Sequence, residues 1–379
     1  MSAAHWRRAM SGGTAGAPRR PVPALRPEPL AEPDPYAHSD APRWLKYLWR
    51  HLSARHVFVA ALVLAYPFVA TPFFTFQIGA QSLALGLIAL SLTFLGGYGG
   101  MVSLSQMTVA GIAGYTVAIL GTSSHTLSLG WPWWVAVPFA LLIATVCAAL
   151  IGWLSVRTEG IYTIMITLAV GVAFYYLALQ NYSVFNGFQG FQKVYPPVLW
   201  GIDWRSPVPF YFVALACAAG GYLLVKWLVR APLGIALQGV RDNPRRMAAL
   251  GFHVVGHRVA AHAVAGLLAA VGGVLLVWYN GLITPNSVNT GWLINILVIA
   301  VLGGMRHPIG PFIGAIVFVL LQTFAIDMID RERFNLVIGA VFLAIVLFSP
   351  DGLLGLAAKW RARHAAGTGS TTTPPRRQA

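Results

Sequence analysis

The sequence predicts an all-α protein, a polytopic transmembrane helix bundle of about ten spans. Of its 379 residues, 57% are hydrophobic and only 10% are charged, whereas a soluble domain carries about 25% charged residues. A nucleic-acid-binding protein would match the net charge of +15 but not the apolar content. The third observation is a series of apolar runs, most of them close to the roughly 20 residues that cross a bilayer.

The N-terminal segment is expected to lie outside the bundle. Residues 1–41 are rich in Pro, Ala, Gly and Arg, so they bury too little apolar surface to fold, and we predict a disordered cytoplasmic tail. Residues 42–55 differ, because Trp44, Leu48 and Leu52 recur at helical spacing between basic side chains. This pattern is typical of an amphipathic helix at the membrane interface; a simple juxtamembrane anchor is the alternative.

Residues 56–358 form the predicted transmembrane domain. The expected spans are 56–73, 77–96, 102–121, 132–156, 160–180, 208–229, 257–280, 291–306, 309–326 and 334–350. The run at 102–121 is rich in Gly and Ser, and a partly re-entrant segment is the alternative there. Residues 359–379 hold five basic and no acidic side chains, and we predict a disordered basic tail.

The distribution of basic residues predicts the orientation. Ten spans place both tails on one side, together with 22 of the 26 Lys and Arg residues. The exceptions are Lys193, Arg205, Arg331 and Arg333. Because basic loops are retained in the cytoplasm, both termini are expected to be cytoplasmic.

Small residues predict closely packed helices. Gly310 and Gly314 lie near the start of one span, and another carries Gly266, Gly272 and Gly273, which let helix backbones approach. We expect no catalytic or metal-binding role for the two cysteines, because Cys147 and Cys217 lie in apolar runs, where a free thiol acts as a small hydrophobic group. His262 is expected at the membrane interface.

The loop at 230–258 contains the clearest local signal. Asn243 before Pro244 is a favourable helix start, and Gly251 is a favourable helix end. Met247 and Leu250 are apolar side chains on a loop that is otherwise basic. Such a short helix suits docking to another protein, and equally suits lying on anionic lipid.

Several chemistries are missing from the chain. None of its four lysines belongs to a phosphate-binding GxxxxGK[ST] loop, so a partner or an ion gradient must supply energy. The acidic residues fall at span ends or in loops, which argues against a proton-coupled carrier. No grouping of Ser, His and Asp and no metal-ligand spacing occurs, so no catalytic, cofactor or metal site is expected. A self-sufficient carrier or channel for small polar solutes remains an alternative, and a membrane enzyme a weaker one.

Several segments resemble a known family. LGGYGGMVSLSQMTVAGIAGYTVAIL (95–120), RTEGIYTIMITLAVG (157–171), the 230–258 loop, IAVLGGMRHPIGPFIGAIVF (299–318) and FSPDGLLGL (348–356) are similar to permease subunits of branched-chain amino-acid ABC importers, of the LivM kind. The resemblance covers about residues 75–357 in the expected order. It departs at Gln106, where the family has His.

The resemblance implies a type II ABC importer permease in the bacterial inner membrane. It also implies a second homologous permease, two cytoplasmic ATPase subunits that bind the ATP, and an extracytoplasmic solute-binding protein. Residues 242–252 would be the coupling helix, with Met247, Leu250 and Gly251 matching the family motif. The candidate coupling residues are Asp242, Asn243, Arg245, Met247, Leu250 and Gly251.

The same resemblance ranks the uncharged polar residues inside the spans. Those beside its glycine-containing motifs are the candidate translocation pathway: Ser103, Ser105, Gln106, Thr163 and Thr167. Bonding within the helix bundle is the alternative role for each of them. The expected solutes are branched-chain or related amino acids, with urea and short amides as the alternative.

Overall fold

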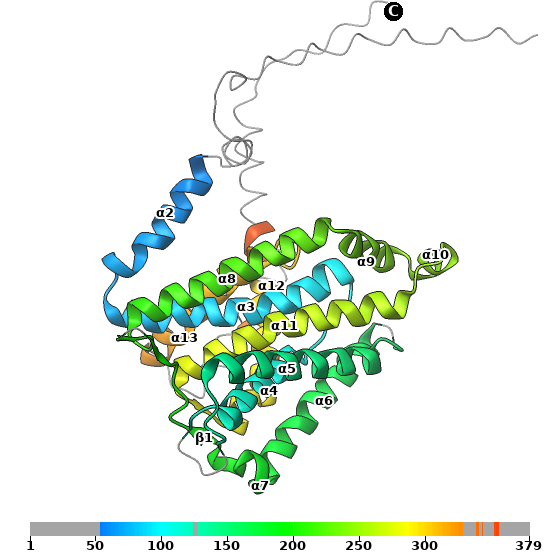
Figure 1. The fold of residues 1–379 in the computed structure, drawn as a ribbon. Helices are drawn as coiled ribbons and strands as arrows, with labels where there is room; N and C mark the ends of the chain where they lie inside the picture. The colour runs from blue at the N-terminus through cyan, green and yellow to red at the C-terminus, as the bar shows by residue number, and fades with distance from the viewer. Residues whose placement is uncertain are drawn as a thin grey trace, which may run out of the picture. The chain divides into compact units, whose positions relative to one another are not determined.

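The computed structural model describes residues 54–123, 128–158, 160–199, 201–328, 339–340, 343 and 352–355. The two tails expected at 1–41 and 359–379, most of the interfacial helix and most of the span at 334–350 lie outside these residues. The chain divides into two compact units, Met1–Val63 and Leu64–Ala379. Helices dominate the described residues (Figure 1), which confirms the all-α class.

The elements follow one another as a run of helices with a few short strands. In order they are α2 Ala54–Val69, η1 Phe74–Ala80, α3 Gln81–Thr93, η2 Phe94–Tyr98, α4 Gln106–Leu120, α5 Trp133–Ser155, α6 Ile161–Gln180, α7 Tyr182–Phe185, η3 Gly187–Gln189, β1 Phe191–Gln192, β2 Val198–Leu199, β3 Ile202–Asp203, α8 Pro207–Arg230, α9 Pro232–Asp242, α10 Pro244–Ala249, α11 Val254–Asn280, β4 Leu282–Ile283, η4 Pro285–Val288, α12 Thr290–Gly303 and α13 Gly310–Met328. The strands form two antiparallel pairs, β1 with β4 and β2 with β3.

One long helix runs through the middle of the bundle. The π-helical turns η1 and η2 extend α3 at either end, so residues 74–98 form one apolar helix. Nearly every side chain of α3 is buried, because α8, α11, α12 and α13 all pack around it. A helix that is hydrophobic on all sides is stable in such a buried position.

The second central helix is α11, which packs against α3, α4 and α5. Its glycines make the close approach possible. A Cβ at Gly266 would lie 2.1 Å from Ala148 Cβ, and one at Gly273 would lie 2.2 Å from the Ala110 carbonyl oxygen. Between α12 and α13, a Cβ at Gly314 would lie 2.1 Å from the Ile299 carbonyl oxygen. The close packing expected from the small residues is therefore confirmed.

The expected spans that fall on described residues agree with the helices to within a few residues, with one exception. Among the described residues, five helices are long and apolar enough to cross a membrane, whereas the apolar helices 106–120, 290–303 and 310–324 are shorter. The expected span 102–121 is wrong in its first part, because residues 101–105 precede α4 without being α-helical. The count of ten spans stays a prediction.

The basic residues separate between the two ends of the bundle. At one end, Thr158 and Arg241 line the same pocket. At this end too, Gly97 lies so close to Met305 that a Cβ at Gly97 would touch the Met305 carbonyl oxygen. The loops that carry Arg157, α9, α10 and Arg306 therefore meet there, and we name this the basic end. The loops around Val194 and Gly281 meet at the opposite end, where the Val194 N–H donates to the Gly281 carbonyl oxygen at 3.0 Å. Figure 1 shows α9 and α10 far from β1 and α7.

The segment 230–258 contains two helices, whereas the sequence predicted only one. Besides α10, it forms α9, an amphipathic helix whose buried residues are Gly234, Ala236, Leu237 and Val240. Pro232 stands in its first turn, where the missing N–H is not needed. Because this face packs onto the bundle, α9 fixes the position of α10 relative to the spans.

Candidate functional site

A cluster of buried polar groups lies where the chain enters α4. Ser103 and Ser105 are almost fully buried, and their hydroxyl oxygens are 2.9 Å apart. Gln106 is also buried, and its Oε1 accepts a hydrogen bond from Ser91 Oγ of α3 at 3.0 Å. The non-helical stretch before α4 thus places hydroxyls and an amide inside an otherwise apolar bundle.

The first turns of α6 complete this cluster. Thr167 Oγ1 accepts a hydrogen bond from the Leu104 N–H at 3.1 Å and donates to the Thr163 carbonyl oxygen at 3.0 Å. Thr163 Oγ1 donates in turn to the Thr158 carbonyl oxygen at 2.9 Å. We name these neighbouring polar residues, which form separate sets of hydrogen bonds, the polar ladder: Ser91, Ser103, Ser105, Gln106, Thr163 and Thr167. The five predicted pathway residues all belong to it.

A polar pocket opens at the basic end of the ladder. It has a volume of about 250 Å³ and is lined by Gly100, Val102, Thr158, Thr163, Arg241 and Arg258 among others. We name it the arginine pocket. The sequence analysis did not single out its arginines, because basic residues are ordinary in the loops at this end of a membrane protein.

The glycine-rich turn that precedes the cluster is held from two sides. Arg241 Nη1, from α9, donates to the Gly97 carbonyl oxygen at 2.7 Å. Gly100 has φ +66°, and a Cβ there would lie 2.5 Å from Arg241 Cγ. On the other side, a Cβ at Gly97 would lie 2.1 Å from the Met305 carbonyl oxygen. Glycine is therefore required for this contact between α9 and the turn that leads to Ser103.

The local geometry of α10 agrees with its sequence signals. Asn243 Oδ1 caps the helix by accepting from the Arg246 N–H at 2.9 Å, and Pro244 occupies the first turn. Gly251, with φ +89°, follows the last helical turn. Leu250 is 67% exposed and Phe252 is 42% exposed. The segment therefore presents two apolar side chains outward at the basic end.

The other predicted coupling residues serve different purposes. Met247 faces α9, because a Cβ at Gly239 would lie 2.9 Å from its sulfur. Asp242 forms an ion pair with Arg241 at 2.9 Å, and Arg245 is exposed. All six residues lie on one short segment, but only Leu250 combines an apolar side chain with high exposure.

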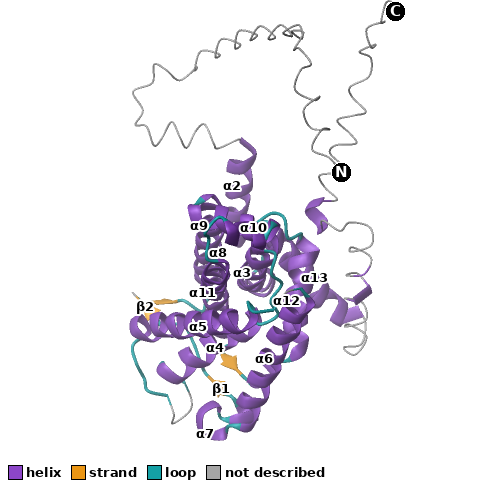
Figure 2. Ribbon diagram, turned by 90° about the vertical axis from the view of Figure 1, so that its right-hand side faces the viewer, coloured by secondary structure: helices purple, strands orange, loops and turns teal. Residues whose placement is uncertain are grey.

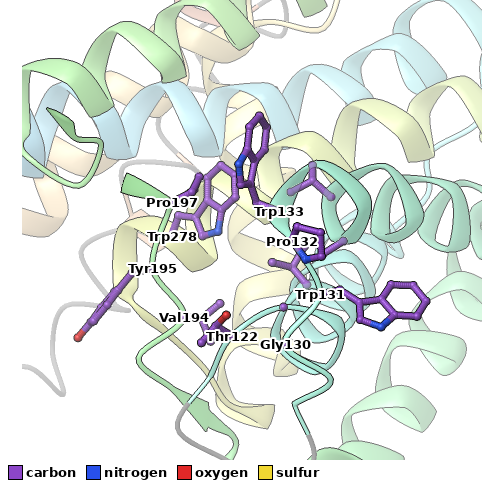
Figure 3. Close-up of a pocket in the computed structure, with 13 residues that line it drawn as sticks. Thr122, Gly130, Trp131, Pro132, Trp133, Val194, Tyr195, Pro197 and Trp278 are labelled. Atoms are coloured by element: carbon purple, nitrogen blue, oxygen red, sulfur yellow. The ribbon is translucent and has the colours of Figure 1, made fainter. Parts of the chain in front are cut away.

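An aromatic pocket lies at the opposite end of the bundle (Figure 3). Its volume is about 240 Å³, and Trp131, Trp133, Tyr195 and Trp278 contribute to its lining. Trp278 stands near the end of α11 and Arg258 near its start. At 1.5 Å per residue, the two pockets are about 30 Å apart along this helix. The segment 101–121 contributes residues to both pockets.

His262 is buried between helices. It is 1% exposed, and its ring fits over Gly152 of α5, where a Cβ would lie 2.6 Å from the ring Cγ. His262 Nδ1 lies 3.0 Å from the Arg258 carbonyl oxygen. No group of three metal-ligating side chains occurs among the described residues. The position of His262 is thus set by the contact between α5 and α11, which sequence spacing alone does not reveal.

The arrangement is that of a multi-pass membrane protein, a bundle of packed helices (Figure 2). Apolar helices surround a set of uncharged polar groups, and a pocket opens at each end. Comparison with known families agrees. The chain belongs to the family described as branched-chain amino acid transport system / permease component, whose model matches residues 74–346.

Individual relatives carry related names. The chain is 27% identical over 323 residues to the high-affinity branched-chain amino acid transport system permease protein LivM of Escherichia coli strain K12, covering 78% of this chain and 74% of the relative. It is 22% identical over 241 residues to the probable LivM permease of Methanocaldococcus jannaschii, covering 56% and 68%. A shorter match, 29% over 156 residues, covers 38% of this chain and 47% of the probable LivH permease of the same organism. No solved structure matches the chain.

Proposed function

We propose that this chain is the permease subunit of an ATP-driven importer that carries branched-chain or related amino acids into the cytoplasm. Its partners would be a homologous permease, two ATPase subunits that bind the ATP, and an extracytoplasmic solute-binding protein. The observation that carries the proposal is the exposed apolar pair Leu250 and Phe252, which directly follows the short, capped helix α10 beside the arginine pocket. In a family of transport permeases, such a protruding segment is suited to receive force from a partner.

The structure offers a route for that force. α10 contacts α9 through Met247, and α9 contacts the glycine-rich turn through Arg241. The turn leads directly into Ser103 and Ser105. Movement of α10 on nucleotide binding by a partner would therefore shift the polar ladder, and alternating access would follow from opening one pocket while closing the other.

The orientation follows from the basic end. Its residues are Arg157, Lys226, Arg230, Arg241, Arg245, Arg246, Arg258 and Arg306, whereas Lys193 and Arg205 belong to the opposite end. This asymmetry supports a cytoplasmic basic end. Cytoplasmic termini in a bacterial inner membrane are part of the same proposal.

The alternatives have less support. Gradient-driven carriers commonly use acidic groups inside the membrane, but the acidic residues among the described positions are Asp203 in β3, Asp242 at the end of α9 and Asp327 in the last turn of α13. His262 is ionisable and buried, but it packs over Gly152 and has no acidic hydrogen-bond partner among the described residues. The aromatic lining around Trp133 and Trp278 favours a solute with an apolar side chain over urea or a short amide.

Replacement of Leu250 with Asp tests the proposal. A carboxylate would have to be buried without a partner in the docked state, so ATPase retention in a pull-down is expected to fall at least about tenfold. Leu282→Asp is the matched control, because Leu282 is a 40% exposed leucine at the opposite end. Normal retention of the ATPase by the Leu250 variant, with both variants inserted in the membrane, would refute docking through α10.

A further inference from the structure

We propose that the arginine pocket is an exit site that binds the carboxylate of the transported amino acid, with Arg258 as the cationic group. This inference rests on the proposed function and extends it to a particular ligand group. It assigns to Arg258 a role in solute contact at the basic end.

The charges around the pocket point to Arg258. Arg241 is already occupied by its ion pair with Asp242 and by its hydrogen bond to Gly97. Arg258 forms no ion pair within the described part of the chain, and its Nε is buried without a hydrogen-bond partner. None of the described residues that line the pocket is acidic. A guanidinium in this state is suited to accept a carboxylate from outside the protein.

The rest of the lining suits a zwitterion. The hydroxyl oxygens of Thr158 and Thr163 lie 3.3 Å apart, and they supply acceptor lone pairs for an ammonium group. Gly160 leaves the space beside it open, since a Cβ there would meet no atom within 4 Å. The volume of about 250 Å³ would hold about eight waters at roughly 30 Å³ each, which is comparable with the size of leucine.

The pocket is continuous with the polar ladder. Thr163 lines the pocket and also accepts, through its carbonyl oxygen, the hydrogen bond from Thr167 that continues to Leu104. A solute that leaves the neighbourhood of Ser103 therefore reaches Arg258 as the first free cationic group. The polar ladder carries no charge, so this arginine can attract the carboxylate towards the cytoplasm.

The test is inhibition of transport from the cytoplasmic side. The complete complex is reconstituted in proteoliposomes with its ATPases facing the lumen, which contains ATP and unlabelled leucine, and uptake of labelled leucine from the binding protein is measured. In the wild type, lumenal leucine is expected to slow uptake. Arg258→Gln is expected to raise the half-inhibitory concentration about tenfold, the effect of losing one charge-assisted hydrogen bond.

Arg157→Gln is the matched control. Arg157 stands at the same end, next to Thr158, but its guanidinium lies over the Trp153 ring at 4.6 Å and does not line the pocket. Arg157→Gln is expected to keep the wild-type half-inhibitory concentration. Arg258→Lys, which retains the positive charge, is expected to stay within a few-fold of that concentration. Lumenal leucinamide, which lacks the carboxylate, should inhibit the wild type about tenfold more weakly than leucine and should be unaffected by Arg258→Gln.

The inference is overturned if Arg258→Gln and the wild type show the same half-inhibitory concentration, or if lumenal leucine does not inhibit the wild type. Equal inhibition by lumenal phosphate would show a general anion site and would also overturn it. If the Gln variant does not insert, leucine and leucinamide are compared on the wild type, and equal potency decides against the carboxylate site. Failure of the proposed function is a separate result, because it would appear as absent uptake with an empty lumen.

Discussion

Gly273→Ala is expected to destabilise the bundle, because there is no room for a methyl group between α11 and α4. The new Cβ would lie 2.2 Å from the Ala110 carbonyl oxygen and 2.6 Å from Ala110 Cα. These are backbone atoms, so no side-chain rotation relieves the overlap. To reach an ordinary contact of about 3.4 Å, the two helices would have to separate by about 1.2 Å.

The magnitude follows from two opposing terms. Overpacking of this kind lowers the free energy of unfolding by about 1–3 kcal/mol. The better helix propensity of alanine raises it by up to about 1 kcal/mol. We expect a net loss of about 1–2 kcal/mol in the free energy of unfolding. Since Ala110 lies one turn after Gln106 in α4, the displacement should also reach the polar ladder and reduce transport.

Gly220→Ala in α8 is the matched control, because a Cβ there would meet no atom within 4 Å. It should leave the free energy of unfolding unchanged or raise it by up to about 1 kcal/mol. Both variants are unfolded by SDS titration in mixed micelles and compared with the wild type. Equal stability of the two variants would refute the close approach of α11 and α4.

Two further substitutions test the ladder and its connection to α9. Thr167→Val leaves the buried Leu104 N–H without its acceptor at 3.1 Å, and we expect the free energy of unfolding to fall by about 1–3 kcal/mol. Thr145→Val is the control and should cost much less, because the Thr145 hydroxyl only donates within α5. Equal losses for the two variants would contradict the bond between Leu104 and Thr167. Arg241→Gln removes the donor to Gly97. It should leave ATPase retention unchanged but lower, by a few-fold, the stimulation of ATP hydrolysis by loaded binding protein; unchanged stimulation would show that this contact transmits nothing.

Much of the fold was accessible from the sequence because the signals are local. Apolar runs predicted α5, α6 and α8 to within one or two residues. The start of α10 was also predicted, since the cap at Asn243 and the proline after it act within one helical turn. Glycines in α11 indicated close packing for the same reason, although they did not reveal which helix each one faces.

The site depended on tertiary structure to a greater degree. Hydropathy treated residues 102–121 as one span, yet the chain is not helical before Gln106, where Leu104 bonds to Thr167 of another helix. Arg241 and Gly97 are 144 positions apart in the chain, so no spacing rule joins them.

The sequence by itself determined that this chain is a helical membrane protein, because average composition and local periodicity decide which segments enter a bilayer as helices. The permease family was indicated by the resemblance of several of its motifs. Only the tertiary structure decided which polar groups meet inside it. In a bilayer every helix is apolar on its lipid side, so the partner of each polar residue is set by helix packing. That packing alone placed Thr167 beside Leu104, brought Thr163 and Arg258 to one pocket, and buried His262 between helices.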